Sequence, residues 1–421
     1  MTNNFHNGVH CSSKITGDNK PTRIESLDII RGFALLGILL MNIQSFSMPA
    51  PAYLNPTAFG DFSGVNFYSW LFTHILVDMK MMNIFSMLFG AGILIYCNRI
   101  EQTAQSSLGL HFKRNSWLLV FGLIHAHFFW YGDILYSYAL CGLIAYWLRH
   151  FSAKRLIGCS LLFLTIGSSY FLILGVSLPF LPEESMRELS LIWQPDIAHL
   201  NNEINAYQGD YLEQLKFRHQ EAIKMETDGF VSIFLWRNLA LICLGMALFK
   251  WQILSAARTT EFYLKLAACC LLPGFAMVAF GAYQNTRHDF NLSFSFFFGS
   301  QFNYWGSILI SIGYIALICL WIDSKQLKNF QGYLANIGKM ALSNYLLHSL
   351  IFTTIFYGHG LGLFSQVERI TLMAMVLGMW LFQFWFSNRW LSIFRMGPLE
   401  WVWRSLTYGK IQSLNRLTKW E

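Results

Sequence analysis

The side chains best suited to chemistry lie in one apolar segment, GLIHAHFFWYGDILYSYALCGLI, which carries two histidines and one carboxylate. On a helix, His125 and His127 point about 200° apart, so only one of them can face the interior of a bundle. The break at Gly132 would let Asp133 fold back toward His125. A histidine beside a carboxylate can act as a general base with an orienting partner. The alternative is a hydrogen-bonded packing histidine.

Two further pairs have the four-residue spacing that places side chains on one face of a helix. In LFTHILVDMK, His74 and Asp78 could form a second base and carboxylate. Asp78 could instead cap the next helix or pair with Lys80. In LSNYLLHS, Asn344 and His348 share a face, and hydrogen bonds between helices are the favoured interpretation there.

A polar stripe crosses the first apolar segment, RIESLDIIRGFALLGILLMNI. At 100° per residue, Asp28, Arg31 and Asn42 fall within roughly 60° of one another. Charged and amide groups on one side of an apolar helix are costly in lipid, so this stripe should face protein or water. Asp28 and Arg31 either pair at the membrane boundary and orient the helix or contribute to a site.

The composition places the chain in a lipid bilayer. It is 54% hydrophobic and only 13% charged, with a mean hydropathy of +0.39, whereas a soluble domain carries about 25% charged residues. The net charge of +7 comes from Lys and Arg that lie mostly in short loops between apolar runs. This pattern is typical of membrane topology, and we expect no nucleic-acid partner.

The predicted fold class is all-α: a polytopic transmembrane helical bundle of about ten spans with an external helical insertion. The apolar run from Phe67 to Asn98 is too long for one straight span, so residues 67–79 are expected to form a separate helix at the outer surface. The expected spans are 29–48, 81–98, 115–131, 133–149, 156–178, 230–250, 262–284, 297–322, 334–357 and 368–387.

The spans divide the chain into five parts. Residues 1–22 are polar and are expected to form a disordered cytoplasmic N-terminus. Residues 23–178 and 230–396 form two transmembrane halves. Between them, 179–229 is an extracytoplasmic insertion, expected as a pair of amphipathic helices whose acidic residues form a solvated surface or recognise substrate. Residues 397–421, rich in Trp, Arg and Lys, are an interfacial cytoplasmic tail. The Lys and Arg distribution places both termini in the cytoplasm.

Several kinds of site have no support in the sequence. Seven of the eight cysteines lie in or beside apolar segments without CxxC spacing, so neither a disulfide framework nor a zinc site is indicated. The chain lacks a Walker A motif, a GxGxxG that opens a helix, HExxH, GxSxG and CxxCH. We therefore expect no resident metal or cofactor.

Five segments resemble the YeiB-like bacterial inner-membrane proteins, a family of unknown function. They are LDIIRGFALLGILLMNI, NIFSMLFGAG, GLIHAHFFWYGDILYSYALCGLI, GKMALSNYLLHSLIFTTIFY and GPLEWVWR, and the resemblance covers residues 23–408. It implies a multi-pass protein of the bacterial inner membrane. His125 and Asp133 match the pattern of that family, whereas His74 and His348 do not.

The family is distantly similar to membrane acyltransferases that include heparan-alpha-glucosaminide N-acetyltransferase. The similarity lies in a D-x-x-R-G at the start of the first span and a carboxylate at the position of Asp78. The catalytic histidine of that relative lies in the outer loop before this carboxylate, and His74 does not have its spacing. The resemblance therefore favours His125 as the base.

Three functions remain open. The first is an acyltransferase that uses cytoplasmic acyl-CoA or a similar donor and an acceptor hydroxyl or amine on an envelope glycan or lipid. Arg31 would hold the donor's negative charge, His125 would take the acceptor proton and Asp133 would orient the imidazole. The alternatives are a small-solute or proton-coupled transporter and a structural protein without turnover. The other candidate substrate-binding residues are Asp28, Asn42, Asp78 and Asn344.

Overall fold

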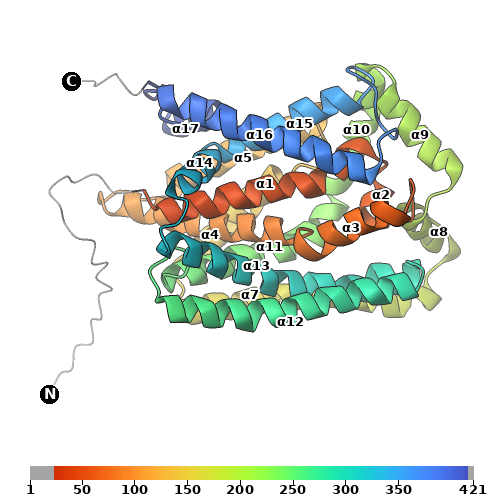
Figure 1. Cartoon of the computed structure of the whole chain (residues 1–421), viewed down its shortest axis with the longest axis horizontal. Coiled ribbons are helices and arrows are strands. Elements are labelled where there is room, and N and C mark those ends of the chain that lie inside the picture. Colours follow the sequence, from red (N-terminus) through yellow and green to blue (C-terminus); the bar gives the residue numbers. More distant parts are fainter. Residues whose placement is uncertain (1–22, 416–421) are drawn as a thin grey trace.

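The computed structural model describes residues 23–415, and the regular structure of this part of the chain is helical (Figure 1). The predicted all-α class is confirmed, whereas residues 1–22 and 416–421 lie outside the described part. The helices are α1 (Glu25–Ser47), α2 (Pro51–Leu54), α3 (Gly64–Leu76), α4 (Lys80–Glu101), α5 (Leu108–Phe128), α6 (Leu135–Leu148), α7 (Ala153–Ser177), η1 (Leu178–Phe180), α8 (Glu183–Trp193), α9 (Ile197–Gln208), α10 (Tyr211–Glu226), η2 (Phe230–Phe234), α11 (Leu235–Lys250), α12 (Thr260–Arg287), η3 (Leu292–Gly299), α13 (Ser300–Asp323), α14 (Lys328–Lys339), α15 (Ala341–Phe356), α16 (Arg369–Ile393) and α17 (Pro398–Tyr408).

Seven helical stretches within residues 23–415 are long and apolar enough to cross a membrane. They contain α1, α3 with α4, α7 with η1, η2 with α11, α12, η3 with α13, and α16. The sequence predicts three more, where the structure has α5, α6 and α15. Of these, α6 and α15 are apolar but only 14 and 16 residues long. The chain is therefore a multi-pass helical membrane protein that spans a lipid bilayer.

Helix breaks divide two apolar runs of the chain. The run that begins at Phe67 is divided after α3, as expected, where Met79 has a left-handed backbone (φ 63°) and α4 then begins at Lys80. The span expected at 334–357 was wrong in its first part, because the helix is broken at Met340. The residues before that break belong to the amphipathic helix α14, whose apolar face packs along α1.

The first helix is the centre of the bundle. In α1, 83% of the most apolar 18-residue window is buried inside the protein, compared with 28% in α7, 33% in α12 and 28% in α16. Figure 1 shows α1 between α16 on one side and α4 on the other. Helices α7, α12 and α16 therefore form much of the lipid-facing surface. The polar stripe of α1 faces protein, as its composition predicts.

Small residues allow the central helices to approach closely. A Cβ atom added at Gly90 of α4 would lie 2.1 Å from the Ile242 carbonyl oxygen of α11, and one added at Gly245 of α11 would lie 1.9 Å from the Met87 carbonyl oxygen. Both distances are far below a van der Waals contact. The two backbones therefore touch, which is a common way to pack helices in a membrane.

The insertion at 179–229 contains three helices, α8, α9 and α10, instead of the expected pair. The additional break has a local cause: the Asp196 side chain accepts a hydrogen bond from the His199 amide, and Asp210 accepts from Leu212 and Glu213, so each aspartate starts a new helix. Figure 1 shows α8 and α9 at one end of the bundle and α17 and the start of α1 at the other. We call the latter the α17 end.

Candidate functional site

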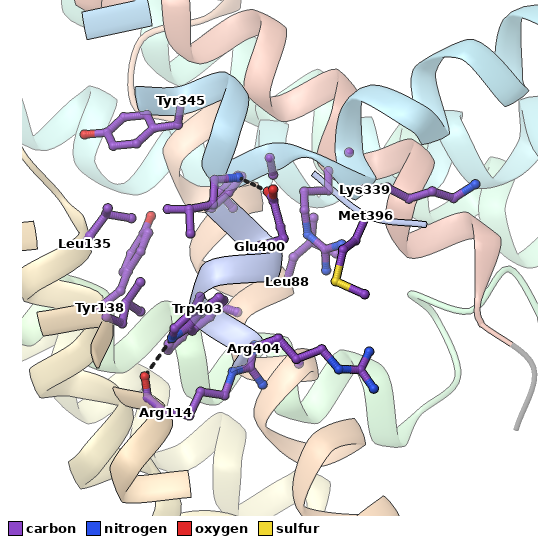
Figure 2. Close-up of a pocket in the computed structure, with 18 of the residues that line it drawn as sticks. Leu88, Arg114, Leu135, Tyr138, Lys339, Tyr345, Met396, Glu400, Trp403 and Arg404 are labelled. Atoms are coloured by element: carbon purple, nitrogen blue, oxygen red, sulfur yellow. Dashed lines mark hydrogen bonds between the residues drawn. The ribbon is translucent and has the colours of Figure 1, made fainter. Parts of the chain in front are cut away.

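A cavity of about 620 Å³ lies at the α17 end, between α1, α4, α5, α6, α15 and α17. Figure 2 shows Lys339 and Arg404 on one side of it and Tyr345, Leu135 and Tyr138 on the opposite side. The two sides differ in chemistry. One is basic and close to the ends of the described chain, and the other is aromatic and apolar and lies toward the middle of the bundle.

The basic side has a strong excess of positive charge. Glu400 is the single carboxylate among the described residues that line the cavity. A recess lined by one sign of charge, with walls of low dielectric constant, concentrates ligands of the opposite charge. This part of the cavity is therefore suited to a polyanion. The basic lining residues are Arg23, Arg31, Arg114, Lys339, Arg395 and Arg404.

The predicted ion pair at the start of α1 is present. Arg31 Nη1 donates to Asp28 Oδ1 at 2.9 Å, and Arg23 pairs with the same carboxylate. The Asp28 side chain is buried, whereas a quarter of the Arg31 side chain is exposed to the cavity. Asp28 therefore holds two guanidinium groups at the wall and leaves this cluster with a net positive charge.

Glu400 of α17 connects the cavity wall to the first turn of α15. Its carboxylate accepts hydrogen bonds from the Leu342 amide at 2.7 Å, the Ser343 amide at 3.1 Å and the Ser343 hydroxyl at 2.5 Å. These amides belong to the positive end of the helix dipole, which favours an anion. Burial nevertheless raises the pKa of Glu400 above its ordinary value.

The position of α17 is further secured by a contact between Trp403 and Arg114. The Trp403 indole donates to the Arg114 carbonyl oxygen at 2.9 Å, and the Arg114 guanidinium lies 4.4 Å from the centre of the Trp403 ring (Figure 2). The segment expected as an interfacial tail thus supplies a wall of the cavity with Glu400, Trp403 and Arg404. Its role as a membrane anchor stays a prediction.

Beyond the inner side of the cavity, His125 lies at the centre of a hydrogen-bonded chain. Its Nδ1 is 2.6 Å from Asp133 Oδ2, and its Nε2 is 2.7 Å from the hydroxyl of Ser349 in α15. The other carboxylate oxygen of Asp133 accepts from the Tyr136 amide at 2.9 Å. His125, Asp133 and Ser349 are at most 2% exposed. The loop around Gly132 therefore brings Asp133 back to His125 as the sequence predicts.

One aromatic ring separates this chain from the cavity. Tyr345 lines the cavity, and its ring centre is 5.3 Å from that of His125. Ile134 also lines the cavity and directly follows Asp133 in sequence. His125 and Asp133 do not themselves line it, whereas Arg31 does. The three residues of the predicted acyl-transfer site thus lie along one path, with Arg31 in the basic part and the pair beyond the inner end.

His127 points elsewhere, as the helical angle predicts. Its Nε2 is 3.3 Å from the Glu226 carboxylate, and its Nδ1 is 2.8 Å from Nδ1 of His219 in α10. It therefore contacts the insertion and lies away from the cavity. Within residues 23–415, the structure holds no group of three or more His, Cys, Asp or Glu side chains placed to bind a metal ion.

Asp78 belongs to a second polar cluster, outside the cavity. The predicted contact with His74 is present at 3.3 Å, and Asn303 of α13 donates to Asp78 at 2.8 Å. The Lys80 ammonium donates to the Asn303 side chain at 2.7 Å and to the His74 carbonyl oxygen at 2.6 Å. Arg237 of α11 continues this cluster through Asn83. The carboxylate at position 78 therefore joins the α3–α4 elbow to α13.

Three other residues singled out in the sequence also lie outside the cavity. Asn344 is fully buried and donates to the Ser387 hydroxyl of α16 at 2.9 Å, and His348 contacts Gln383 of the same helix at 2.7 Å. These are the hydrogen bonds between helices that the spacing predicts. Asn42 is half-buried near the far end of α1, about 20 Å along the helix from Asp28 at 1.5 Å per residue.

Four residues of this region were not among the predicted site residues: Ser349, Tyr345, Glu400 and Arg114. Ser349 is 224 residues from His125, and a serine in an apolar helix carries no signal of such a contact. Glu400 and Arg114 had a weak signal, because each is a charged residue near aromatic residues in the first two turns of a helix. That pattern is equally typical of a membrane interface.

The fold and the cavity define the class of this protein: a multi-pass helical membrane protein with a basic cavity that ends near a buried histidine and carboxylate. Residues 248–410 match the family described as "Protein of unknown function (DUF418)". The chain is 33% identical over 402 residues to the uncharacterized protein YeiB of Escherichia coli (strain K12), covering 91% of this chain and 95% of that protein.

More distant relatives also match over most of the chain. The uncharacterized protein YxaH of Bacillus subtilis (strain 168) is 28% identical over 414 residues, covering 94% of this chain and 97% of the relative. An uncharacterized 39.9 kDa protein of Bacillus acidopullulyticus is 25% identical over 406 residues, covering 92% and 94%. The chain belongs to the YeiB-like DUF418 family, and the resemblance seen in the sequence is confirmed.

Proposed function

We propose that this protein transfers an acyl group from an acyl-CoA-like donor to a hydroxyl or amine of an envelope glycan or lipid. The chemistry of the lining changes along the cavity, and this change supports the proposed function. Its basic part is lined by six Lys and Arg side chains, and its inner part ends at Tyr345, one ring away from His125. An acyl-CoA has the same order of chemical groups, with phosphates at one end and a thioester with its acyl chain at the other.

Each part of the donor has a counterpart in the cavity. The guanidinium group of arginine binds phosphate oxygens with charge-assisted hydrogen bonds. The ion pair with Asp28 holds the Arg31 guanidinium in position for this contact. The apolar side chains of Leu135, Phe85 and Ile134 suit the acyl chain. In this arrangement the donor is held by its charged head, and its thioester approaches Tyr345.

The histidine provides the general base. With Asp133 ionised, His125 Nδ1 donates to the carboxylate and Nε2 is left as the acceptor of a proton. His125 takes the proton of the acceptor hydroxyl or amine as it attacks the thioester carbonyl, the C–S bond breaks, and the proton is passed to the departing thiolate. Asp133 keeps the imidazole in the correct tautomer and orientation.

The proposal includes a topology. We assign about ten crossings, made by α1, α4, α5, α6, α7, α11, α12, α13, α15 and α16. An even number returns the chain to the side on which it began, and the excess of Lys and Arg assigns that side to the cytoplasm. The donor then enters from the cytoplasm at the α17 end of a bacterial inner membrane, and the acceptor reaches the pair from the side of α8 and α9.

The test uses His125→Gln, which keeps a polar side chain of similar size. Cells with wild-type protein or the variant are supplied with a donor labelled in its acyl group, and the envelope glycans and lipids are extracted. We expect label in the wild-type extract and a loss of at least 100-fold in the variant, with equal amounts of protein in the membrane. An unlabelled wild-type extract contradicts the proposal.

A transporter is the second candidate, because of the cluster around Asp78. Lys80 and Arg237 are at most 3% exposed, and charged side chains inside membrane helices often mark an ion or proton path. Proton flux into proteoliposomes that is driven by a solute and abolished by Asp78→Asn supports this candidate. Acyl transfer that is unaffected by Asp78→Asn, with no such flux, contradicts it.

A further inference from the structure

We propose that Ser349 is the nucleophile that first receives the acyl group, so that transfer passes through an acyl-serine ester on the protein. This inference rests on the proposed acyl transfer and replaces the direct attack of the acceptor on the thioester with two steps through a covalent intermediate. Its basis is the hydrogen-bonded chain of Ser349, His125 and Asp133, which brings a hydroxyl, an imidazole and a carboxylate together from α15, α5 and the loop before α6.

The distances fit an activated nucleophile. Ser349 Oγ is 2.7 Å from His125 Nε2, and His125 Nδ1 is 2.6 Å from Asp133 Oδ2. When Nδ1 donates to the carboxylate, Nε2 is the acceptor, and the serine hydroxyl must donate to it. A nucleophile next to a base that is oriented by a third group is the arrangement by which hydroxyl groups are activated in acyl transfer.

The hydroxyl of Ser349 also has a different kind of hydrogen-bond partner from several other Ser and Thr hydroxyls in the apolar helices. A serine or threonine in an apolar helix commonly donates to the carbonyl oxygen four residues earlier. Thr353 does so to Ser349 at 2.7 Å, Thr354 to Leu350 at 2.7 Å, and Ser86 to Met82 at 2.9 Å. The Ser349 hydroxyl instead points across the bundle to an imidazole that is buried with it.

A donor in the cavity can approach this hydroxyl past Tyr345. Tyr345 is four residues before Ser349 on α15, which is just over one turn or about 6 Å along the helix. Because Tyr345 lines the cavity and packs against His125, a change of its side-chain rotamer would open the inner end to Ser349. The thioester carbonyl then reaches the serine from the side opposite the acceptor.

The two steps balance without an oxidant or reductant. In the first, Ser349 Oγ attacks the thioester carbonyl carbon, His125 Nε2 takes the hydroxyl proton, the C–S bond breaks and the proton goes to the thiolate. In the second, an acceptor hydroxyl or amine attacks the ester carbonyl, His125 takes its proton, the C–O bond to the serine breaks and Ser349 Oγ regains a proton. The released products are a free thiol and the acylated acceptor.

The experiment looks for the ester directly. Purified full-length protein in nanodiscs is incubated without acceptor with acetyl-CoA, octanoyl-CoA and palmitoyl-CoA, each labelled at the carbonyl carbon. We expect label that withstands denaturation, is released by hydroxylamine and maps by mass spectrometry to the peptide with Ser349. Ser349→Ala should lose this label at least 100-fold and keep CoA binding, whereas Ser349→Cys should carry the acyl group as a thioester.

A matched control is Thr353→Val, which removes a hydroxyl one turn further along α15 that bonds only to backbone carbonyls. It should be labelled like wild type. If the wild type acylates the envelope acceptor and Ser349→Ala does so at the same rate, direct transfer is correct and the acyl-serine is overturned alone. If the wild type neither binds CoA nor releases thiol from any of the three donors, both the acyl-serine and the acyl transfer are overturned.

Discussion

Replacing Arg31 with Gln should weaken donor binding at the basic part of the cavity. The change removes one positive charge from the wall and leaves Asp28 paired with Arg23. A charge-assisted hydrogen bond contributes about 1.5–3 kcal/mol. Since a quarter of the Arg31 side chain is exposed and therefore screened by solvent, we take the lower figure. This corresponds to a Kd for CoA that is about tenfold higher in the variant.

The measurement is equilibrium binding of radiolabelled CoA to purified protein in nanodiscs at two salt concentrations. Phosphate binding by several cations weakens as salt rises, because screening is strong beyond about 8 Å at physiological ionic strength. Affinity should therefore fall with salt more steeply in the wild type than in Arg31→Gln. Arg99→Gln is the control, since Arg99 is exposed in the last turn of α4 and does not line the cavity. Equal CoA affinity of wild type and Arg31→Gln, or an equal loss of affinity in Arg99→Gln, contradicts this prediction.

Three further predictions concern stability and access. Gly338→Val should lower the melting temperature markedly, because a Cβ there would lie 2.0 Å from the Asp28 carbonyl oxygen, and overpacking costs about 1–3 kcal/mol; Gly332→Ala, with open space around it, should not. Burial raises the pKa of Glu203 from its ordinary value of 4.5 to about 7. The contribution of this carboxyl group to the stability of the fold is therefore complete below pH 4.5 and is lost as the pH rises through 7. Melting temperature should therefore fall between pH 5 and 8 in the wild type and stay flatter in Glu203→Gln; parallel curves contradict this. Tyr345→Ala should speed acylation of the protein by long-chain donors, measured as thiol release; an unchanged rate means that this ring does not limit access.

Local patterns were sufficient to predict several contacts of the site. The break at Gly132 and the helical angle between His125 and His127 are properties of a few adjacent residues, and they predict the contact with Asp133. The spacing of three between Asp28 and Arg31 predicts their ion pair in the same way. The low charge content predicts the helical membrane fold. The two contacts, His125 with Asp133 and Asp28 with Arg31, each join residues at most eight positions apart in the chain. The local sequence is therefore enough to predict them.

Contacts between distant segments could not be predicted in this way. Ser349 meets His125 only because the fold brings the side chains of α15 within reach of α5, and Glu400 reaches α15 only because α17 packs against that helix. The break between α14 and α15 at Met340 was missed because the apolar pattern continues across it. A single sequence reports hydrophobic periodicity, whereas these features depend on which helices are neighbours.

In the proposed function, a polyanionic acyl donor occupies this cavity with its acyl group at the inner end. The most direct measurement is photo-crosslinking with an acyl-CoA analogue that carries a diazirine at the end of the acyl chain, followed by mass spectrometry of the labelled peptides. We predict adducts on the inner wall, at Tyr345, Leu135 or Tyr138, which are lost when excess CoA competes. Adducts confined to the lipid-facing helices α7 and α12, or adducts that excess CoA does not reduce, would contradict it.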